Sequence, residues 1–205
     1  MQRFLCIFLG DKNESKKRNV INGLSVIILY RKNAKNLLKY KQVYVNNQQI
    51  SQFDYLLHEN DHIENPAVKS VLSAKLLEAQ NKGIGISVEI DEPVRDLFIE
   101  VLDFITFLSI LCDNAIEASL ESEDPQLTLA MLQDTNSLIL IVENSTKAEK
   151  IELARIFEKD YSSKGEGRGL GLYKIQQLLE KYPKTTVSTK SSNYRFTQSL
   201  TFWKE

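Results

Sequence analysis

A cluster of glycines near the C-terminus has a spacing that suits phosphate binding. Four of the eight glycines in this 205-residue chain fall within a short stretch, at Gly165, Gly167, Gly169 and Gly171. Glycine is unfavourable inside helices and strands, so the cluster indicates backbone that approaches another group closely. A helical apolar pattern follows at once, and a glycine loop leading into a helix presents N–H groups and the positive dipole end to an anion. The alternative is an ordinary surface loop.

A second segment places a carboxylate and amide stripe on a predicted helix. From Phe104 to Ser119 apolar residues recur at helical spacing, and Asp113, Asn114 and Glu117 lie together on another face. An Asp-Asn pair is costly within an apolar helix because both residues are weak helix formers. An amide oxygen in such a place can hold Mg²⁺, which prefers oxygen ligands. The alternative is an exposed polar stripe, but the glycine cluster further along the chain favours a site.

These two motifs resemble those of a known ATP-binding domain. Residues 113–118, Asp-Asn-Ala-Ile-Glu-Ala, resemble the asparagine box shared by gyrase, Hsp90, histidine kinases and MutL, and residues 167–172 resemble their second glycine box. Within this group the chain resembles the histidine kinases of Gram-positive bacteria that sense peptide pheromones, the accessory-gene-regulator and competence type. The resemblance covers residues 65–205. It implies an α+β fold, the two-layer α/β sandwich called the Bergerat ATP-binding fold.

The resemblance implies ATP and Mg²⁺ as cofactors and assigns roles to individual residues. Asn114 would be the Mg²⁺ ligand that bridges the phosphates. Asn144 stands where the family usually has an Asp that binds the adenine amino group, and its side-chain oxygen can accept that bond, more weakly than a carboxylate. Residues 145–148, Ser-Thr-Lys-Ala, replace the glycines that usually follow, a departure from the family pattern. The implied cofactor-binding residues are Asp113, Asn114, Glu117, Asn144, Lys164, Gly165, Gly167, Arg168, Gly169, Leu170, Gly171 and Leu172.

The segment around the glycines would also supply a lid and charge. By the resemblance, Ile156, Phe157 and Tyr161 would belong to a mobile lid over the nucleotide. Lys164 and Arg168 would meet phosphate charge; the alternative is that both are ordinary loop cations.

The residue at position 110 favours phosphotransfer over hydrolysis. Gyrase-type relatives place a Glu one helical turn before the asparagine, and here that position is Ile110. Without this base water is poorly activated, so the γ-phosphoryl group is kept for another acceptor. We therefore expect a histidine-kinase-type phosphotransferase of a two-component, quorum-sensing type system, unless Glu117 or Asp113 takes over the role of the base. The alternative is a non-catalytic ATP-binding or RNA-binding protein, a truncated or fused kinase relic.

The sequence lacks the histidine hairpin that accepts phosphate in such kinases. Its two histidines, His58 and His62, stand in a polar pattern with no long helical periodicity, so we interpret both as loop residues rather than phosphoacceptors. No catalytic side chain is assigned for the same reason. The expected partners are a response regulator and either a histidine-bearing kinase partner or a second copy in a homodimer.

The first 63 residues differ in character from the rest. Residues 1–50 hold ten Lys or Arg and two Asp or Glu, a net charge of +8, whereas the remainder carries −9. Segments 37–47 and 55–63 resemble the RNA-binding fold of ribosomal protein S4, so RNA binding through residues 1–63 is one hypothesis. A small basic domain, or remnant sequence from a fusion or truncation, is the other. We expect residues 1–63 to form a small basic α/β module and residues 65–205 the ATP-binding catalytic domain.

Composition is that of a globular protein, with 42% hydrophobic and 26% charged residues. The apolar runs are too short to span a bilayer, and the N-terminus has no cleavage-site pattern. The two cysteines, Cys6 and Cys112, indicate a reducing compartment. We therefore expect a cytoplasmic chain without a membrane span.

Periodicity predicts the order of the elements after residue 65. Helices are expected over 66–82, over 104–119, over 149–157 and after the glycine cluster from 170 onward; strands are expected over 84–90, 127–132, 138–142, 184–190 and 194–203.

Overall fold

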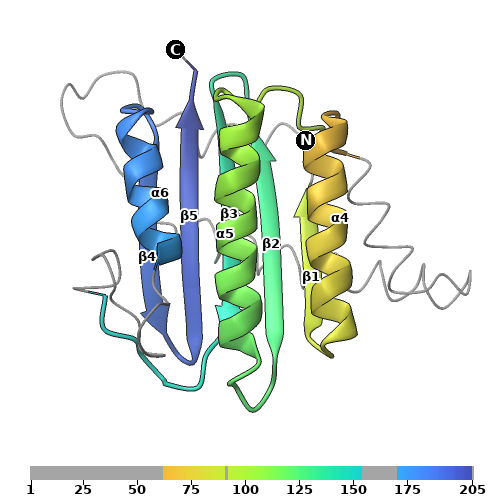
Figure 1. The fold of residues 1–205 in the computed structure, drawn as a ribbon, viewed down its shortest axis with the longest axis vertical. Coiled ribbons are helices and arrows are strands. Elements are labelled where there is room, and N and C mark those ends of the chain that lie inside the picture. Colours follow the sequence, from red (N-terminus) through yellow and green to blue (C-terminus); the bar gives the residue numbers. More distant parts are fainter. Residues whose placement is uncertain (1–61, 91, 154–169, 205) are drawn as a thin grey trace, which may run out of the picture. The chain divides into compact units, whose positions relative to one another are not determined.

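The computed structural model describes residues 62–90, 92–153 and 170–204, and every structural statement below concerns these residues. They form one five-stranded sheet whose front face in Figure 1 is covered by three helices, α4, α5 and α6. This is the two-layer α+β sandwich that the sequence predicts. The basic module expected over residues 1–63 lies almost wholly outside the described residues.

The sheet is mixed, and its order is β1-β2-β3-β5-β4. The strands are β1 (Gly85–Ile90), β2 (Gln126–Gln133), β3 (Ser137–Ser145), β4 (Thr186–Ser192) and β5 (Arg195–Trp203). β1 pairs with β2 in parallel, so the chain must cross over between them, and α5 provides the crossover. The other three pairings are antiparallel and place β3 between β2 and β5, in the middle of the sheet.

Helix α4 (Pro66–Asn81) begins where the sequence predicts. The side chain of Asn65 caps it by accepting hydrogen bonds from the N–H groups of Ala67 and Val68, and Pro66 occupies the first turn, where its missing N–H costs nothing. The chain leaves the helix at Gly83, whose φ of 76° is left-handed backbone that suits glycine. Its buried face consists of Val68, Leu72, Leu76 and Ala79.

Helix α5 (Val101–Ser119) carries the predicted apolar stripe. Phe104, Phe107, Leu108, Leu111, Cys112 and Ala115 are all buried. The rings of Phe104 and Phe107 pack against Phe202 of β5, with centroids 5.4 and 5.6 Å apart. Burial of the Cys112 thiol raises its pKa to about 12, which fits the expectation of a packed core residue. Because this stripe faces the sheet, the polar residues of α5 lie toward the neighbouring helices and the surface.

The N-terminus of α5 is capped by a residue that follows α6. Its N-cap residue, Glu100, makes no side-chain cap bond; instead its N–H donates to the hydroxyl of Tyr182, just after α6 (Leu170–Glu180), at 3.3 Å. That hydroxyl in turn donates to Asp103, in the first turn of α5, and Lys181 Nζ lies 2.6 Å from the same carboxylate oxygen. These bonds to Lys181 and Tyr182 hold the pKa of Asp103 below its ordinary value. We call Asp103, Lys181 and Tyr182 the helix clamp.

One expected element is wrong over its described part. Residues 149–153 are not helical, although a helix is expected over 149–157; the remainder of that range lies outside the described residues. The backbone there bonds elsewhere: Tyr194 N–H donates to the Glu149 carbonyl at 3.0 Å, and Ile151 N–H donates to Ser191 Oγ at 2.7 Å. These bonds to the β4–β5 hairpin replace the local bonds that a helix needs.

The remaining boundaries fall close to the predicted ones. β4 starts two residues later than expected, and the other strands agree within three residues at each end. Among the described helices, none combines the length and the apolar character needed to cross a bilayer.

Candidate functional site

The asparagine motif and the last glycine of the glycine motif meet in the structure. A Cβ atom placed on Gly171, in the first turn of α6, would lie 3.4 Å from Asn114 Oδ1 and 3.5 Å from Asn114 Nδ2. It would also lie 3.1 Å from Cγ2 of Ile110, one turn earlier on α5. A side chain at this position would crowd Ile110, so glycine suits the close approach of α6 to α5. The structure therefore brings these two segments, which lie far apart in sequence, into contact.

Asn114 carries a buried polar atom with nothing to bind inside the described chain. Its Nδ2 is buried and has no hydrogen-bond partner among the described residues. Most buried polar groups in folded proteins are paired, and leaving one unpaired costs about 1–3 kcal/mol. The unpaired Nδ2 lies beside Gly171, which has no side chain, at the start of α6. This arrangement suits a polar ligand. A buried N–H donor fits an acceptor such as a phosphate oxygen of the nucleotide that the resemblance implies, and the amide oxygen Oδ1 is the kind of ligand that Mg²⁺ prefers.

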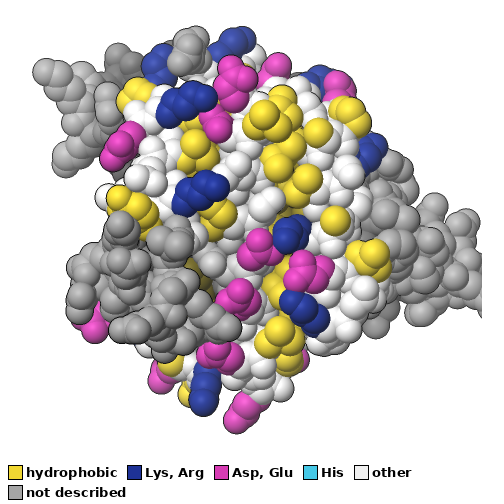
Figure 2. All heavy atoms as spheres, viewed as in Figure 1, with side chains coloured by type: hydrophobic (Ala, Val, Ile, Leu, Met, Phe, Trp, Pro, Cys, Tyr) yellow, Lys and Arg dark blue, Asp and Glu magenta, His cyan; other side chains and the backbone are white. Residues whose placement is uncertain are grey.

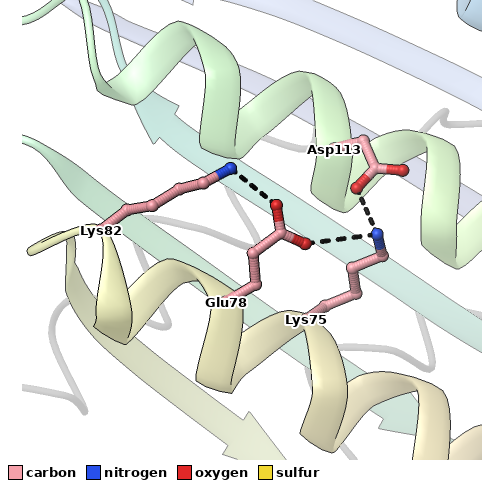
Figure 3. A network of polar contacts seen from close by, with 4 residues as sticks. All are labelled: Lys75, Glu78, Lys82 and Asp113. Atoms are coloured by element: carbon pink, nitrogen blue, oxygen red, sulfur yellow. Dashed lines mark hydrogen bonds and ion pairs between the residues drawn. The ribbon is translucent and has the colours of Figure 1, made fainter.

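Asp113 is engaged by helix α4. Figure 3 shows its carboxylate bonded to Lys75 of α4, whose ammonium also lies 3.5 Å from Glu78; Glu78 in turn pairs with Lys82 at 2.6 Å. Burial lowers the pKa of Lys75, but the hydrogen bonds and charges of Asp113 and Glu78 together outweigh it, so the net shift is upward. The network holds the residue before Asn114 in place. Sequence reasoning missed Lys75, since nothing local to it signals a partner 38 residues away.

The position of the missing base and the alternative base Glu117 occupy different surroundings. Ile110 is half-buried and faces Gly171, so the position that hydrolysing relatives fill with a Glu does point into the contact between α5 and α6. Glu117 lies one turn beyond Asp113 and is exposed. The structure therefore places an apolar side chain, not a carboxylate, next to Asn114 on the side of Gly171.

Asn144 lies at the end of the central strand β3 and is buried, with 2% of its surface exposed. Its Nδ2 donates to the backbone carbonyl of Ser145 at 2.7 Å, which leaves Oδ1 as the acceptor that an adenine amino group requires. Ser145 Oγ accepts from the Gln126 N–H at 2.9 Å and lies 2.8 Å from Ser122 Oγ. Side-chain hydrogen bonds thus fix the end of β3, where family relatives carry glycines.

Several expected site residues lie outside the described residues. They are Lys164, Gly165, Gly167, Arg168 and Gly169, together with the lid residues Ile156, Phe157 and Tyr161. Leu170 begins α6, and Leu172 is half-buried and packs against the core. The roles given to the outlying residues stay predictions.

The surface beside the site is electrostatically mixed. On the helix-bearing face in Figure 2, Lys and Arg side chains alternate with Asp and Glu, and the described residues show no broad basic patch there.

Two polar side chains of the sheet were missed by sequence reasoning. Gln198 of β5 is buried, with 3% of its surface exposed, and Thr189 of β4 is its Cα partner in the ladder. The Nε2 atom of Gln198 and the Oγ1 atom of Thr189 are buried and make no hydrogen bond to any described residue. A lone Gln in a strand pattern gives no signal in the sequence.

Solved structures define the class of fold. The catalytic domain of the histidine kinase ThkA superposes with a TM-score of 0.57 and 19% identity, covering 67% of this chain and 90% of that one. Full-length ShkA, solved in complex with AMPPNP, matches with a TM-score of 0.53 and 18% identity over 65% of this chain and 28% of its own. A mycobacterial sensor histidine kinase, MprB, gives a TM-score of 0.52 at 15% identity over 64% of this chain and 91% of that chain. The fold is that of a histidine-kinase catalytic domain.

The family follows from the sequence. The model of the GHKL domain matches residues 99–203, just over half of the chain, and the chain belongs to this family. A curated relative, the sensor protein CitS of Bacillus subtilis strain 168, is 29% identical over 136 residues, which cover 64% of this chain. The match spans 24% of the length of CitS, so the chain corresponds to about a quarter of that protein.

Proposed function

We propose that residues 65–205 bind MgATP and transfer its γ-phosphoryl group to a histidine on a partner chain. The observation that carries this proposal is the contact between Asn114, with its unpaired buried amide, and Gly171 at the start of α6. Family membership supports the nucleotide, and the fold of histidine-kinase catalytic domains supports the reaction class.

Different residues would bind different parts of MgATP. Asn114 Oδ1 would hold the metal ion, while the backbone at the start of α6 would face the phosphates. Mg²⁺, when bound, neutralises charge on the transferring phosphoryl group. Asn144 Oδ1 would accept from the adenine amino group, at the end of β3. Lys75 would hold Asp113, and with it the turn of α5 that carries Asn114.

Phosphotransfer is favoured over hydrolysis because, among the described residues, an apolar side chain stands one turn before Asn114, where the resemblance implies a Glu in hydrolysing relatives. Ile110 fills that place and packs toward Gly171. The acceptor would be a histidine in a kinase partner that carries the histidine hairpin, and a response regulator would receive the group next. We further propose a peptide-sensing, quorum-type system, on the strength of the motif resemblance. RNA binding through residues 1–63 remains a separate hypothesis that lies outside the described residues.

Calorimetric titration with MgATP tests the nucleotide proposal. Asn114→Ala removes the metal-ligating oxygen, and we expect MgATP binding to weaken by about 1–3 kcal/mol, the scale of a lost buried polar partner. Asn81→Ala, an exposed residue at the end of α4, is the matched control and should bind as the parent does. Titration without Mg²⁺ should reduce the difference between parent and Asn114→Ala. Equal affinity of parent and variant for MgATP would contradict the assignment.

A further inference from the structure

Two polar side chains, Gln198 and Thr189, lie in one row of the sheet beneath the helices, close to Asn144. The ladder pairs Val142 of β3 with Gln198 of β5, and Gln198 with Thr189 of β4. Val142 belongs to the core between sheet and helices, so the whole row faces the helix layer. Asn144 follows Val142 by two residues and therefore shares that face.

Asn144 and Gln198 are diagonal neighbours. Asn144 pairs with Phe196, and Gln198 lies two residues further along β5 on the same face. Diagonal neighbours in an antiparallel pair lie about 7–8 Å apart, within reach of long side chains. The two amides are both buried, at 2% and 3% exposure. A single small flat group could bridge them.

The two amides offer opposite hydrogen-bonding groups. The Nδ2 of Asn144 donates a hydrogen bond to the carbonyl of Ser145, so the remaining polar atom of its side chain is the acceptor Oδ1. Gln198 has Nε2, a donor, without a partner among the described residues. Adenine presents an amino donor next to the N1 acceptor, whereas guanine presents an oxygen acceptor next to an N1–H donor. The pair complements the edge of adenine and mismatches that of guanine.

We propose that Gln198 is a specificity-determining residue that donates from Nε2 to N1 of the adenine ring, directly or through one ordered water. This inference rests on the proposed function, since Asn144 must receive the amino group of the same base. Thr189, whose Oγ1 also lacks a partner among the described residues, is the second polar group that can hold such a water. Because Gln198 is closed to solvent, bulk water cannot replace the lost bond when the donor is removed.

The test compares ATP with 1-deaza-ATP, which keeps the amino group and lacks N1. We expect the parent to bind ATP about 10-fold more tightly than 1-deaza-ATP, the scale of one buried hydrogen bond. Gln198→Met keeps the length and burial of the side chain and removes the donor. It should bind ATP about 10-fold more weakly and show no preference between the two nucleotides. Gln177→Met, an exposed position on α6, is the control and should keep the preference.

The outcomes separate this inference from the proposed function. If the parent binds ATP and 1-deaza-ATP equally, or if Gln198→Met keeps the parent preference, Gln198 does not read N1, while ATP binding itself stands. If the parent binds no nucleotide, both proposals are wrong. Should Gln198→Met fail to fold, the comparison within the parent still decides, and Thr189→Val, which retains size, should reduce the preference if the hydroxyl holds the bridging water.

Discussion

Gly171 determines how closely α6 approaches Asn114. Its missing side chain leaves a space that a methyl group would fill at 3.1 Å from Ile110 and 3.4 Å from Asn114 Oδ1. The first distance is tighter than an ordinary contact between side-chain carbons. The residue therefore controls the geometry of the site without supplying a functional group.

Gly171→Ala should weaken MgATP binding while changing stability little. The new methyl would crowd Ile110 at 3.1 Å, so the two helices must adjust slightly at the site. Alanine favours a helix over glycine by about 1 kcal/mol, so the two effects on unfolding partly cancel. Calorimetry with MgATP and thermal unfolding of the same sample measure both. Lys174→Ala, exposed on the same helix, is the control. Unchanged affinity together with an unchanged melting temperature would show that the contact does not shape the site.

Ile110 leads to a prediction about rate. General-base assistance contributes about 10²–10⁴-fold, and the residue next to Asn114 is apolar. The purified protein should therefore hydrolyse ATP very slowly even when saturated with MgATP, as a phosphate-release assay can measure. Fast turnover that disappears in Glu117→Gln would instead identify the exposed Glu117 as the base and water as the acceptor.

At the scale of elements, α6 is fixed at both ends. Its first turn abuts α5 at Gly171, and the helix clamp joins its C-terminal end to the first turn of α5. Tyr182 takes over the role that a local cap residue plays in most helices: it accepts from Glu100 and donates to Asp103. The N-terminus of α5 and the angle of α6 are therefore set together.

The helix clamp should make the free energy of unfolding depend on pH in the acidic range. The hydrogen bonds from Lys181 and Tyr182 lower the pKa of Asp103 below its ordinary 3.8, so its stabilisation is present above that pH and is lost as pH falls through the lowered folded-state value. Asp103→Asn should cost about 1 kcal/mol near pH 7, and the cost should decrease steadily as the pH is lowered below 3.8, measured by denaturant unfolding.

Asp96→Asn is the control for this experiment. Asp96 is exposed, and the bonds described for it involve only its backbone, so its replacement should shift stability little at either pH. A cost of Asp103→Asn that stays the same at both pH values would show that the charge of Asp103 is not what matters.

At the scale of the whole molecule, the sequence predicts what local patterns encode. The start of α4 follows from Asn65 and Pro66, and the site at α5 and α6 follows from an Asp-Asn pair in an apolar helix and a glycine cluster before another. Each of these signals depends on neighbours a few residues apart.

What the sequence does not predict depends on partners far along the chain. The ion pair of Lys75 with Asp113, the cap from Tyr182 and the position of Gln198 all arise from packing between elements. The expected helix at 149–153 is wrong for the same reason, since its backbone bonds to the β4–β5 hairpin. The parallel pairing of β1 with β2 has no signature in periodicity.

The isolated protein should not phosphorylate itself. His62 lies in a turn beside the bridge between Ile63 and Val94, and its carbonyl accepts from the Val94 N–H at 2.8 Å, a setting unlike an acceptor helix. Incubation with labelled ATP should leave the chain unlabelled, whereas a partner carrying a histidine hairpin should gain acid-labile label. Asn114→Ala with the same partner is the negative control. Acid-labile label on His58 of the isolated protein would overturn this prediction.

The buried thiol of Cys112 can be used to measure how often the domain opens. It lies fully buried on α5, two residues before Asn114, and its pKa of about 12 leaves almost no thiolate at neutral pH. An alkylating reagent can reach it only when α5 separates from the sheet, so the rate of modification at this position reports the equilibrium between closed and open domain. A nucleotide that binds the closed form must slow that reaction in proportion to its occupancy. Ligand binding can thus be followed at an atom that the ligand never touches.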